Sequence, residues 1–432
     1  MSRLLKVYCS GLAVVLIASA SPHARQAAAP QTPPPAGNPA AAQGRGRGAA
    51  AVKSLEIGAD RKVTFRLRAP NAKEVVVSVA GKRLPMVKDD QGVWSVTTDP
   101  LTPDIYTYSL IVDGATVGDL TNRQVQTSFG SFQPMFSVPG PEPWLPAAGV
   151  PRGAIARHAF HSGIANDDRD FFVYTPPGYD ARRPQAYPVF YLLHGLGDDA
   201  ERWMNGGGAN VILDNLIAQQ KAVPMVMVTT LGYGVPNGPA GANAPENLTG
   251  YTKILLEEVM PMVEKAYNVS KDRNQRAIAG LSMGGAEALY TGLNHLDKFA
   301  WIASFSGAYV MWPDARPASR AAPPAAPADP ASAAPGAGRG RGAGTQPTID
   351  AAVFAKTFPA LDAKANSQIR LLWIVCGTAD GLIGVNRQFK EWLKSKNVQF
   401  TEQEVPDIGH VWPLWRQNVT DLAPRLFQPK GK

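Results

Sequence analysis

The feature that most constrains this chain is the stretch Gly280-Leu281-Ser282-Met283-Gly284-Gly285. The apolar run 276–279 precedes it, and the good helix-forming segment 286–290 follows. Gly-x-Ser-x-Gly between a strand and a helix is typical of a nucleophile elbow, a sharp turn that exposes a reactive serine. A side chain on either flanking glycine would collide with the adjoining strand or helix. Ser282 would also lie at a helix N-terminus, where free N–H groups favour developing negative charge. The stretch therefore makes Ser282 a candidate nucleophile.

From about residue 155 onward, strand patterns alternate with helix patterns. This alternation predicts an α/β domain, 150–428, whose mostly parallel sheet has helices on both faces. The predicted strands cover 171–175, 187–193, 224–230, 276–280, 300–305, 370–376 and 398–405. The predicted helices cover 208–220, 251–267, 283–295, 384–396 and 413–425, with Pro261 expected to kink the second of them.

An acyl-transfer site built on Ser282 needs a base and an acid that orients the base. The chain has six histidines, and in the α/β-hydrolase order of serine, acid and histidine only His410 can be the base. The acid should follow the preceding strand, where Asp380 comes after the apolar run 371–376 and a glycine-containing turn. Asp407 is the competitor, but it lies on the same loop as His410 and is better explained as a turn residue. The spacing therefore predicts a triad of Ser282, Asp380 and His410.

The sequence His194-Gly195-Leu196-Gly197 follows an apolar strand directly and occupies the place of an oxyanion loop. The backbone N–H groups of Leu196 and Met283 are the expected oxyanion donors. His194 is expected to hold this loop by hydrogen bonding rather than to move protons.

Two indoles are candidate substrate contacts. Trp203 follows the oxyanion loop, and Trp412 comes two residues after the base. Both would suit a planar acyl group or a sugar ring by stacking, and packing of the loops is the alternative. No metal-ligand spacing is present, and the acidic run 167–170 is better explained as a solvated loop than as a calcium site. We therefore expect neither a metal nor a cofactor.

Residues 51–140 show short strand patterns separated by turn signals, at 63–67, 75–79, 93–96 and 106–110, which predict a β-sandwich. The run 65–72 together with Trp94, Tyr106 and Tyr108 resembles the early-set immunoglobulin-like domains found beside carbohydrate-active enzymes. These aromatics could form a platform for sugar, or they could fill the sandwich core.

Three segments lie outside the two predicted domains. Residues 1–20 have a basic start, an apolar core and a small-residue site, as in a signal peptide, which predicts export to the periplasm or medium and no membrane anchor after cleavage. Residues 21–50 and 315–347 are rich in Ala, Pro, Gly and Arg-Gly, which predicts a disordered linker and a disordered insertion, with a lid as the alternative for the insertion. These three segments carry the whole formal charge of +8, so nucleic-acid binding by a folded basic face has little support.

Four ordered motifs, at 173–180, 191–195, 277–285 and 409–412, resemble the putative esterase family, which includes feruloyl, acetylxylan and enterochelin-type esterases. The resemblance covers nearly all of 155–425. It implies an α/β-hydrolase fold, a serine esterase that works through an acyl-enzyme, and feruloyl or acetyl esters of plant polysaccharides as substrates. Hydrolysis of a catechol siderophore ester is the alternative within this class. The alternative from another class is a carbohydrate-binding protein whose hydrolase domain is only a scaffold. The acyl group, the choice between hydrolysis and acyl transfer, and the oligomeric state stay open.

Overall fold

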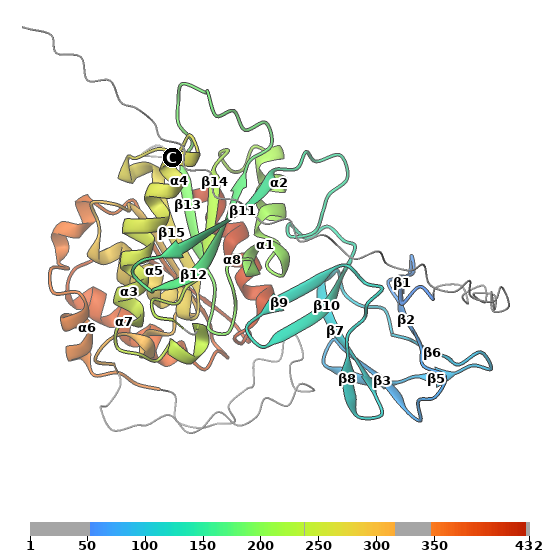
Figure 1. Cartoon of the computed structure of the whole chain (residues 1–432). Coiled ribbons are helices and arrows are strands. Elements are labelled where there is room, and N and C mark those ends of the chain that lie inside the picture. The colour runs from blue at the N-terminus through green and yellow to red at the C-terminus, as the bar shows by residue number, and fades with distance from the viewer. Residues whose placement is uncertain (1–51, 237, 316–346, 429–432) are drawn as a thin grey trace, which may run out of the picture. The chain divides into compact units, whose positions relative to one another are not determined.

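The computed structural model describes residues 52–236, 238–315 and 347–428 (Figure 1). The predicted signal peptide 1–20, the predicted linker 21–50 and almost all of the predicted insertion 315–347 lie outside these residues. None of the helices within the described ranges is both long enough and apolar enough to span a membrane.

The N-terminal part is built of two antiparallel sheets. One has the order β1-β2-β6-β5, and the other has the order β4-β3-β7-β10-β9, with β8 paired to β7. The bounds are β1 Leu55–Ile57, β2 Val63–Arg68, β3 Val75–Val79, β4 Lys82–Pro85, β5 Val87–Lys88, β6 Val93–Thr97, β7 Asp104–Val112, β8 Ala115–Val117, β9 Val125–Ser128 and β10 Ser131–Val138. The four predicted strands correspond to β2, β3, β6 and β7, and inward-facing residues such as Phe65 and Val77 form one apolar core between the sheets.

The aromatic residues of this region belong to that core. Trp94 and Tyr108 are buried, the indole N–H of Trp94 donates to the Ala69 carbonyl over 2.9 Å, and the Tyr108 hydroxyl donates to Asp119. The Tyr106 ring stacks on Phe136 with centroids 5.5 Å apart. Their positions therefore favour core packing over the sugar platform.

The C-terminal part contains an eight-stranded sheet with the order β11-β12-β14-β13-β15-β16-β17-β18. Strands β11 and β12 are antiparallel to their neighbours, and the strands from β14 to β18 run parallel. The bounds are β11 Ala154–Ser162, β12 Asp167–Thr175, β13 Val189–Leu193, β14 Val226–Thr230, β15 Arg276–Leu281, β16 Trp301–Phe305, β17 Leu371–Gly377 and β18 Thr401–Val405.

Helices cover both faces of this sheet (Figure 1). Successive residues of β13 point to opposite faces: Val189, Tyr191 and Leu193 enter one core, whereas Phe190 and Leu192 enter the other. The first face packs against α3 Asn247–Lys253, α4 Met260–Ala266, α5 Met283–Asn294, α6 Ala351–Thr357 and α7 Ile383–Ser395. The second packs against α1 Arg202–Asn205, α2 Ala209–Ala218 and α8 Trp412–Leu422. Burial on both faces explains why the central strands are apolar without alternation.

Every predicted strand and helix of this domain overlaps an observed one, but the short helices α1 and α6 were not predicted, and there are two further differences. The helix predicted over 251–267 is continued between α3 and α4 by a π-helical segment, Ile254–Val259, and Pro261 lies directly after this segment, at the second residue of α4. The edge strand β11 was not predicted. Its residues are mostly exposed or half-buried, so its sequence lacks the apolar run that marks the central strands.

The described residues from Val52 onward cluster as one compact unit, which includes both the sandwich and the hydrolase sheet. The segment between them is fixed to the hydrolase, because the Asn215 side-chain amide of α2 donates to the carbonyls of Pro143 and Leu145 over 2.8 and 2.9 Å.

Candidate active site

Ser282 stands at a sharp turn between β15 and α5. Its backbone has φ 53° and ψ −114°, a conformation that L-residues rarely adopt. The turn is held by two backbone hydrogen bonds: the Ser282 N–H donates to the Phe305 carbonyl over 2.9 Å, and the Ala308 N–H donates to the Ser282 carbonyl over 2.8 Å. The surrounding sheet therefore enforces the strained geometry expected of a nucleophile elbow.

The glycines on either side of Ser282 are required by close packing. A Cβ on Gly280 would overlap the backbone of Gly284 at the start of α5. A Cβ on Gly284 would lie 2.5 Å from the carbonyl oxygen of His194, to which the Gly284 N–H itself donates over 3.0 Å. Helix α5 can therefore approach the loop after β13 only because residue 284 has no side chain.

The predicted acid and base are hydrogen-bonded to each other. Asp380 follows β17 and His410 follows β18, and the Nδ1 of His410 lies 2.8 Å from Oδ2 of Asp380. Asp407, the competing acid, has a left-handed backbone with φ 55°, and its N–H donates to the Thr378 hydroxyl over 2.9 Å. The structure thus brings Asp380, and not Asp407, onto the imidazole.

The surroundings of Asp380 favour its ionised form. Burial of the side chain would by itself raise the pKa, but hydrogen bonds from His410, the Leu382 N–H and Ser306 outweigh it and lower the pKa of Asp380 below its usual value. The Asp380 carboxylate therefore stays negative and can stabilise a proton on His410.

Contacts through Trp415 connect this pair to the elbow. The indole of Trp415 packs edge-on against His410 with centroids 4.8 Å apart, and its N–H donates to the Ser306 hydroxyl over 3.2 Å. Ser306 directly follows Phe305, whose carbonyl accepts from Ser282. Among the described residues, no hydrogen bond joins the Ser282 hydroxyl to His410. Such bonds are commonly long without substrate and shorten when it binds.

The loop after β13 lies against Ser282, as expected for an oxyanion loop. A Cβ placed on Gly195 would come within 3.5 Å of the Ser282 Cβ. Met283 is the first residue of α5, so its N–H has no acceptor within the helix. The Leu196 N–H likewise has no acceptor among the residues that the structure describes. Both predicted donors are therefore available beside the nucleophile.

His194 is buried and holds this loop in place. Its Nδ1 donates to the Gly195 carbonyl over 2.7 Å, and its Nε2 accepts from the Gly232 N–H over 2.9 Å. Burial lowers the pKa of His194 to about 4, so the ring is neutral, as both hydrogen bonds require. This is the structural role predicted from the sequence.

Of the two predicted substrate contacts, Trp203 lies inside the protein and Trp412 is partly buried. Trp203 is fully buried in α1, and its indole N–H donates to the Leu193 carbonyl over 2.8 Å. Trp412 packs edge-on against Trp203 with centroids 5.1 Å apart, and the guanidinium of Arg202 lies 4.5 Å from the Trp412 ring centroid. These positions favour the alternative that both indoles pack the loops around the site.

The acidic run 167–170 belongs to strand β12 and not to a solvated loop, which corrects the sequence interpretation. Asp168 pairs with His161, and Asp170 pairs with Arg157. The described residues contain no cluster of three or more acidic, histidine or cysteine side chains that could hold a metal ion.

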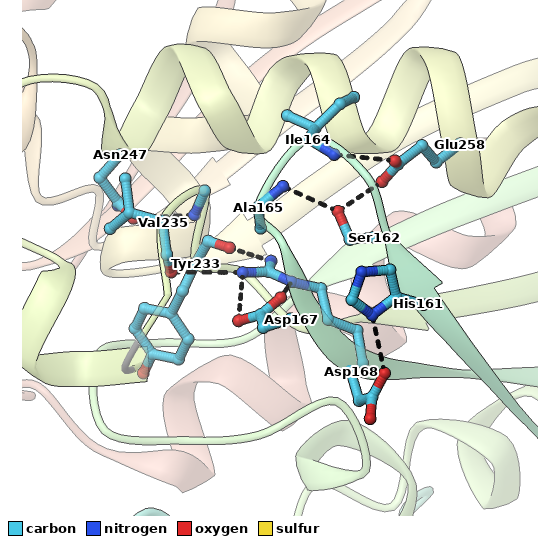
Figure 2. A network of polar contacts seen from close by, with 12 residues as sticks. His161, Ser162, Ile164, Ala165, Asp167, Asp168, Tyr233, Val235, Asn247 and Glu258 are labelled. Carbon is cyan, nitrogen blue, oxygen red and sulfur yellow. Dashed lines mark hydrogen bonds and ion pairs between the residues drawn. The ribbon is translucent and has the colours of Figure 1, made fainter.

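Sequence reasoning missed a network of polar contacts that includes Asp167 and Tyr233 (Figure 2), and the buried Arg169 joins these two residues. The Arg169 guanidinium pairs with Asp167 and donates to the carbonyls of Tyr233 and Val235. It thereby fixes the loop after β14, which lies next to His194. The only sequence signal was an aromatic residue between two glycines, Gly232-Tyr233-Gly234, directly after a strand.

The chain is similar to known esterases in sequence and in fold. A family model described as "Putative esterase" matches residues 162–426. An endo-1,4-beta-xylanase/feruloyl esterase of Xylanibacter ruminicola is 33% identical over 262 residues, which are 57% of this chain and 35% of that protein. The chain thus spans about a third of that relative.

Solved structures agree with this match. A ferulic acid esterase superposes with a TM-score of 0.50 at 25% identity, over 64% of this chain and 99% of the other. The enterobactin esterase of Shigella flexneri superposes with a TM-score of 0.55 at 19% identity, over 84% of this chain and 93% of the other, which shows the shared α/β-hydrolase fold. The family model matches more than half of the chain, and the strands, the elbow and the loops of this chain lie where the motifs predicted them. The protein therefore belongs to the putative esterase family.

Proposed function

We propose that this esterase is exported and cleaves feruloyl or acetyl esters of plant polysaccharides through an acyl-enzyme on Ser282. The observation that carries the mechanism is the Asp380–His410 hydrogen bond of 2.8 Å, at the sheet edge where the elbow also lies. Because Asp380 engages Nδ1 of His410, Nε2 is left to take the proton of the serine hydroxyl.

In the proposed reaction His410 removes the Ser282 proton as the hydroxyl oxygen attacks the ester carbonyl. The negative charge on the carbonyl oxygen is stabilised by the N–H groups of Leu196 and Met283. His410 then protonates the departing alcohol, and a water molecule activated by the same imidazole hydrolyses the acyl-enzyme. Asp380 holds the ring orientation and stabilises the imidazolium in both steps.

The substrate proposal is supported by the relatives. The match to the xylanase/feruloyl esterase and the superposition on a ferulic acid esterase favour a hydroxycinnamoyl ester, with acetyl second. The export proposal is supported by the composition of residues 1–20.

One assay panel tests this function. The purified protein and Ser282→Ala are each given methyl ferulate, acetylated xylan and a cyclic catechol siderophore ester. We expect turnover of methyl ferulate that Ser282→Ala abolishes while its circular dichroism spectrum and melting temperature stay unchanged. Preferred cleavage of the siderophore ester would replace the proposed substrate. No turnover of any ester would favour the non-catalytic, carbohydrate-binding alternative.

A further inference from the structure

The oxyanion loop has partners on two sides, and one of them comes from the sandwich. On the hydrolase side, the Tyr233 hydroxyl accepts from the Gly197 N–H over 2.8 Å and donates to the Asp198 carbonyl over 3.2 Å. On the sandwich side, the N–H of Phe129, at the tip of the β9–β10 hairpin, donates to the Gly197 carbonyl over 2.9 Å. The N–H and the carbonyl of Gly197, the residue after the Leu196 donor, therefore both have hydrogen-bond partners.

The two partners also contact each other. The rings of Phe129 and Tyr233 meet edge-on with centroids 5.5 Å apart. A Cβ on Gly238 would lie 2.6 Å from the Phe129 ring, so the start of the 3₁₀ helix Gly238–Gly241 packs closely against this ring. Thr127, also on the hairpin, donates from its hydroxyl to Asp199 over 2.9 Å. The hairpin therefore contacts the oxyanion loop at more than one point.

Hydrogen bonds to its own carbonyl and to the next N–H hold the backbone of Tyr233 in place (Figure 2). Its carbonyl accepts from the buried Arg169, and the next residue, Gly234, donates from its N–H to the Asn247 side chain over 2.8 Å. Because its backbone is anchored, the Tyr233 hydroxyl can fix the position of Gly197. Residues that support catalytic groups keep those groups in productive geometry in this way.

We propose that Tyr233 and the hairpin residue Phe129 are positioning residues for the oxyanion hole, which makes the sandwich part of the catalytic unit. The idea rests on the proposed ester hydrolysis. Neither residue touches the reacting atoms. They set the direction of the Leu196 N–H, which matters chiefly when charge develops on the carbonyl oxygen.

The test compares three variants of the full chain on p-nitrophenyl acetate, a small ester. Tyr233→Phe removes only the hydroxyl, and Phe129→Ala removes only the ring. Phe132→Ala is the matched control, because Phe132 lies on the same hairpin and is 58% exposed. We expect kcat to fall about 10–100-fold for Tyr233→Phe and about 5–20-fold for Phe129→Ala, with KM nearly constant, and to change less than twofold for Phe132→Ala.

A second measurement separates positioning from loss of stability. Phenylboronic acid forms a tetrahedral adduct on the nucleophilic serine and places an oxygen in the oxyanion hole. Its affinity should fall in parallel with kcat/KM in the two positioning variants, at a temperature well below their melting points. If Phe129→Ala lacks a cooperative melting transition, Phe129→Leu replaces it.

Normal kcat and normal boronate affinity in Tyr233→Phe and in the folded Phe129 variant would overturn the proposal. A KM increase with unchanged kcat would also overturn it, since this would indicate substrate contact. Failure of the parent protein to hydrolyse any ester would instead contradict the proposed function, so the two failures are distinguishable.

Discussion

Arg416 of α8 donates to Asp104 of β7 over 2.7 Å and so joins the hydrolase to the sandwich by an ion pair in which Arg416 is buried and Asp104 partly buried. Arg416 also donates to the Gly206 carbonyl, and Asp104 also accepts from the Trp144 indole N–H. Burial lowers the pKa of Arg416 to about 10, although the charge of Asp104 opposes this shift. The guanidinium is thus a buried cation that depends on one carboxylate.

Asp104→Asn should therefore destabilise the protein. The change keeps the shape but leaves Arg416 without its countercharge, which typically costs about 3–5 kcal/mol. Urea unfolding measures the loss. Asp99→Asn is the control, because Asp99 pairs with Lys82 at the surface and exposed pairs contribute little. Equal stability of the two variants would show that the buried pair contributes nothing.

The acid of the triad gives a second prediction. Asp380→Asn should lower kcat by on the order of 10⁴-fold, because the amide cannot hold the required tautomer of His410 or stabilise its protonated form. Asp407→Asn serves as the control and should leave kcat nearly unchanged, since that side chain is exposed at a turn. Steady-state kinetics on one ester suffices, and the reverse ranking would reassign the acid.

Trp203 gives a third prediction, which follows from its burial. Trp203→Ala should cost about 3–5 kcal/mol of stability, as large-to-small core changes do. It should also reduce kcat/KM by the same factor for methyl ferulate and for a small acetyl ester, since the indole supports the loop and does not contact the acyl group. Trp301→Ala, a buried indole at the start of β16, should lower stability without the loss of activity. A loss confined to methyl ferulate would show that Trp203 binds the acyl group.

Glu287 gives a fourth prediction, which concerns pH. This α5 residue is fully buried, neither carboxyl oxygen has a hydrogen-bond partner among the described residues, and burial raises its pKa well above the usual value. Its carboxyl lies beside Gly232, close to His194. Since the folded state retains this proton longer than the unfolded state, ionisation of Glu287 opposes folding as the pH rises above about 4.5.

Glu287→Gln removes this titration. The free energy of unfolding of the parent protein, minus that of the variant, should therefore decrease as the pH rises from about 4.5 towards neutrality. Denaturant unfolding at half-unit pH intervals measures the difference. A difference that does not change with pH would mean that Glu287 titrates alike in both states.

The sequence predicted the parts of the site that lie at strand ends. Ser282 and Asp380 each follow an apolar strand, and His410 follows the last predicted strand of the sheet. Parallel strands bring such ends to one edge, so order along the chain was enough. The direction of a side chain was not predictable in the same way. Trp203 lies six residues after the oxyanion loop, yet the packing of α1 turns its indole into the core.

The supporting residues left almost no sequence signal. Phe129 lies at a hairpin tip and Arg169 lies within an acidic run, and their partners are distant in sequence. Arg169 is buried because it pairs with Asp167 and two carbonyls, which no periodic pattern encodes. Such contacts depend on tertiary packing and not on local propensity.

The Arg416–Asp104 pair also bears on the order in which the chain matures. The two residues are 312 positions apart, and α8 is the last α-helix among the described residues. During synthesis from the N-terminus, the sandwich leaves the ribosome before the hydrolase does. Its Asp104 face stays uncovered until nearly the whole hydrolase has followed. The contact between the two parts is therefore completed only after α8 has been synthesised, so a ribosome that stalls shortly before α8 would hold a folded sandwich that still lacks this partner.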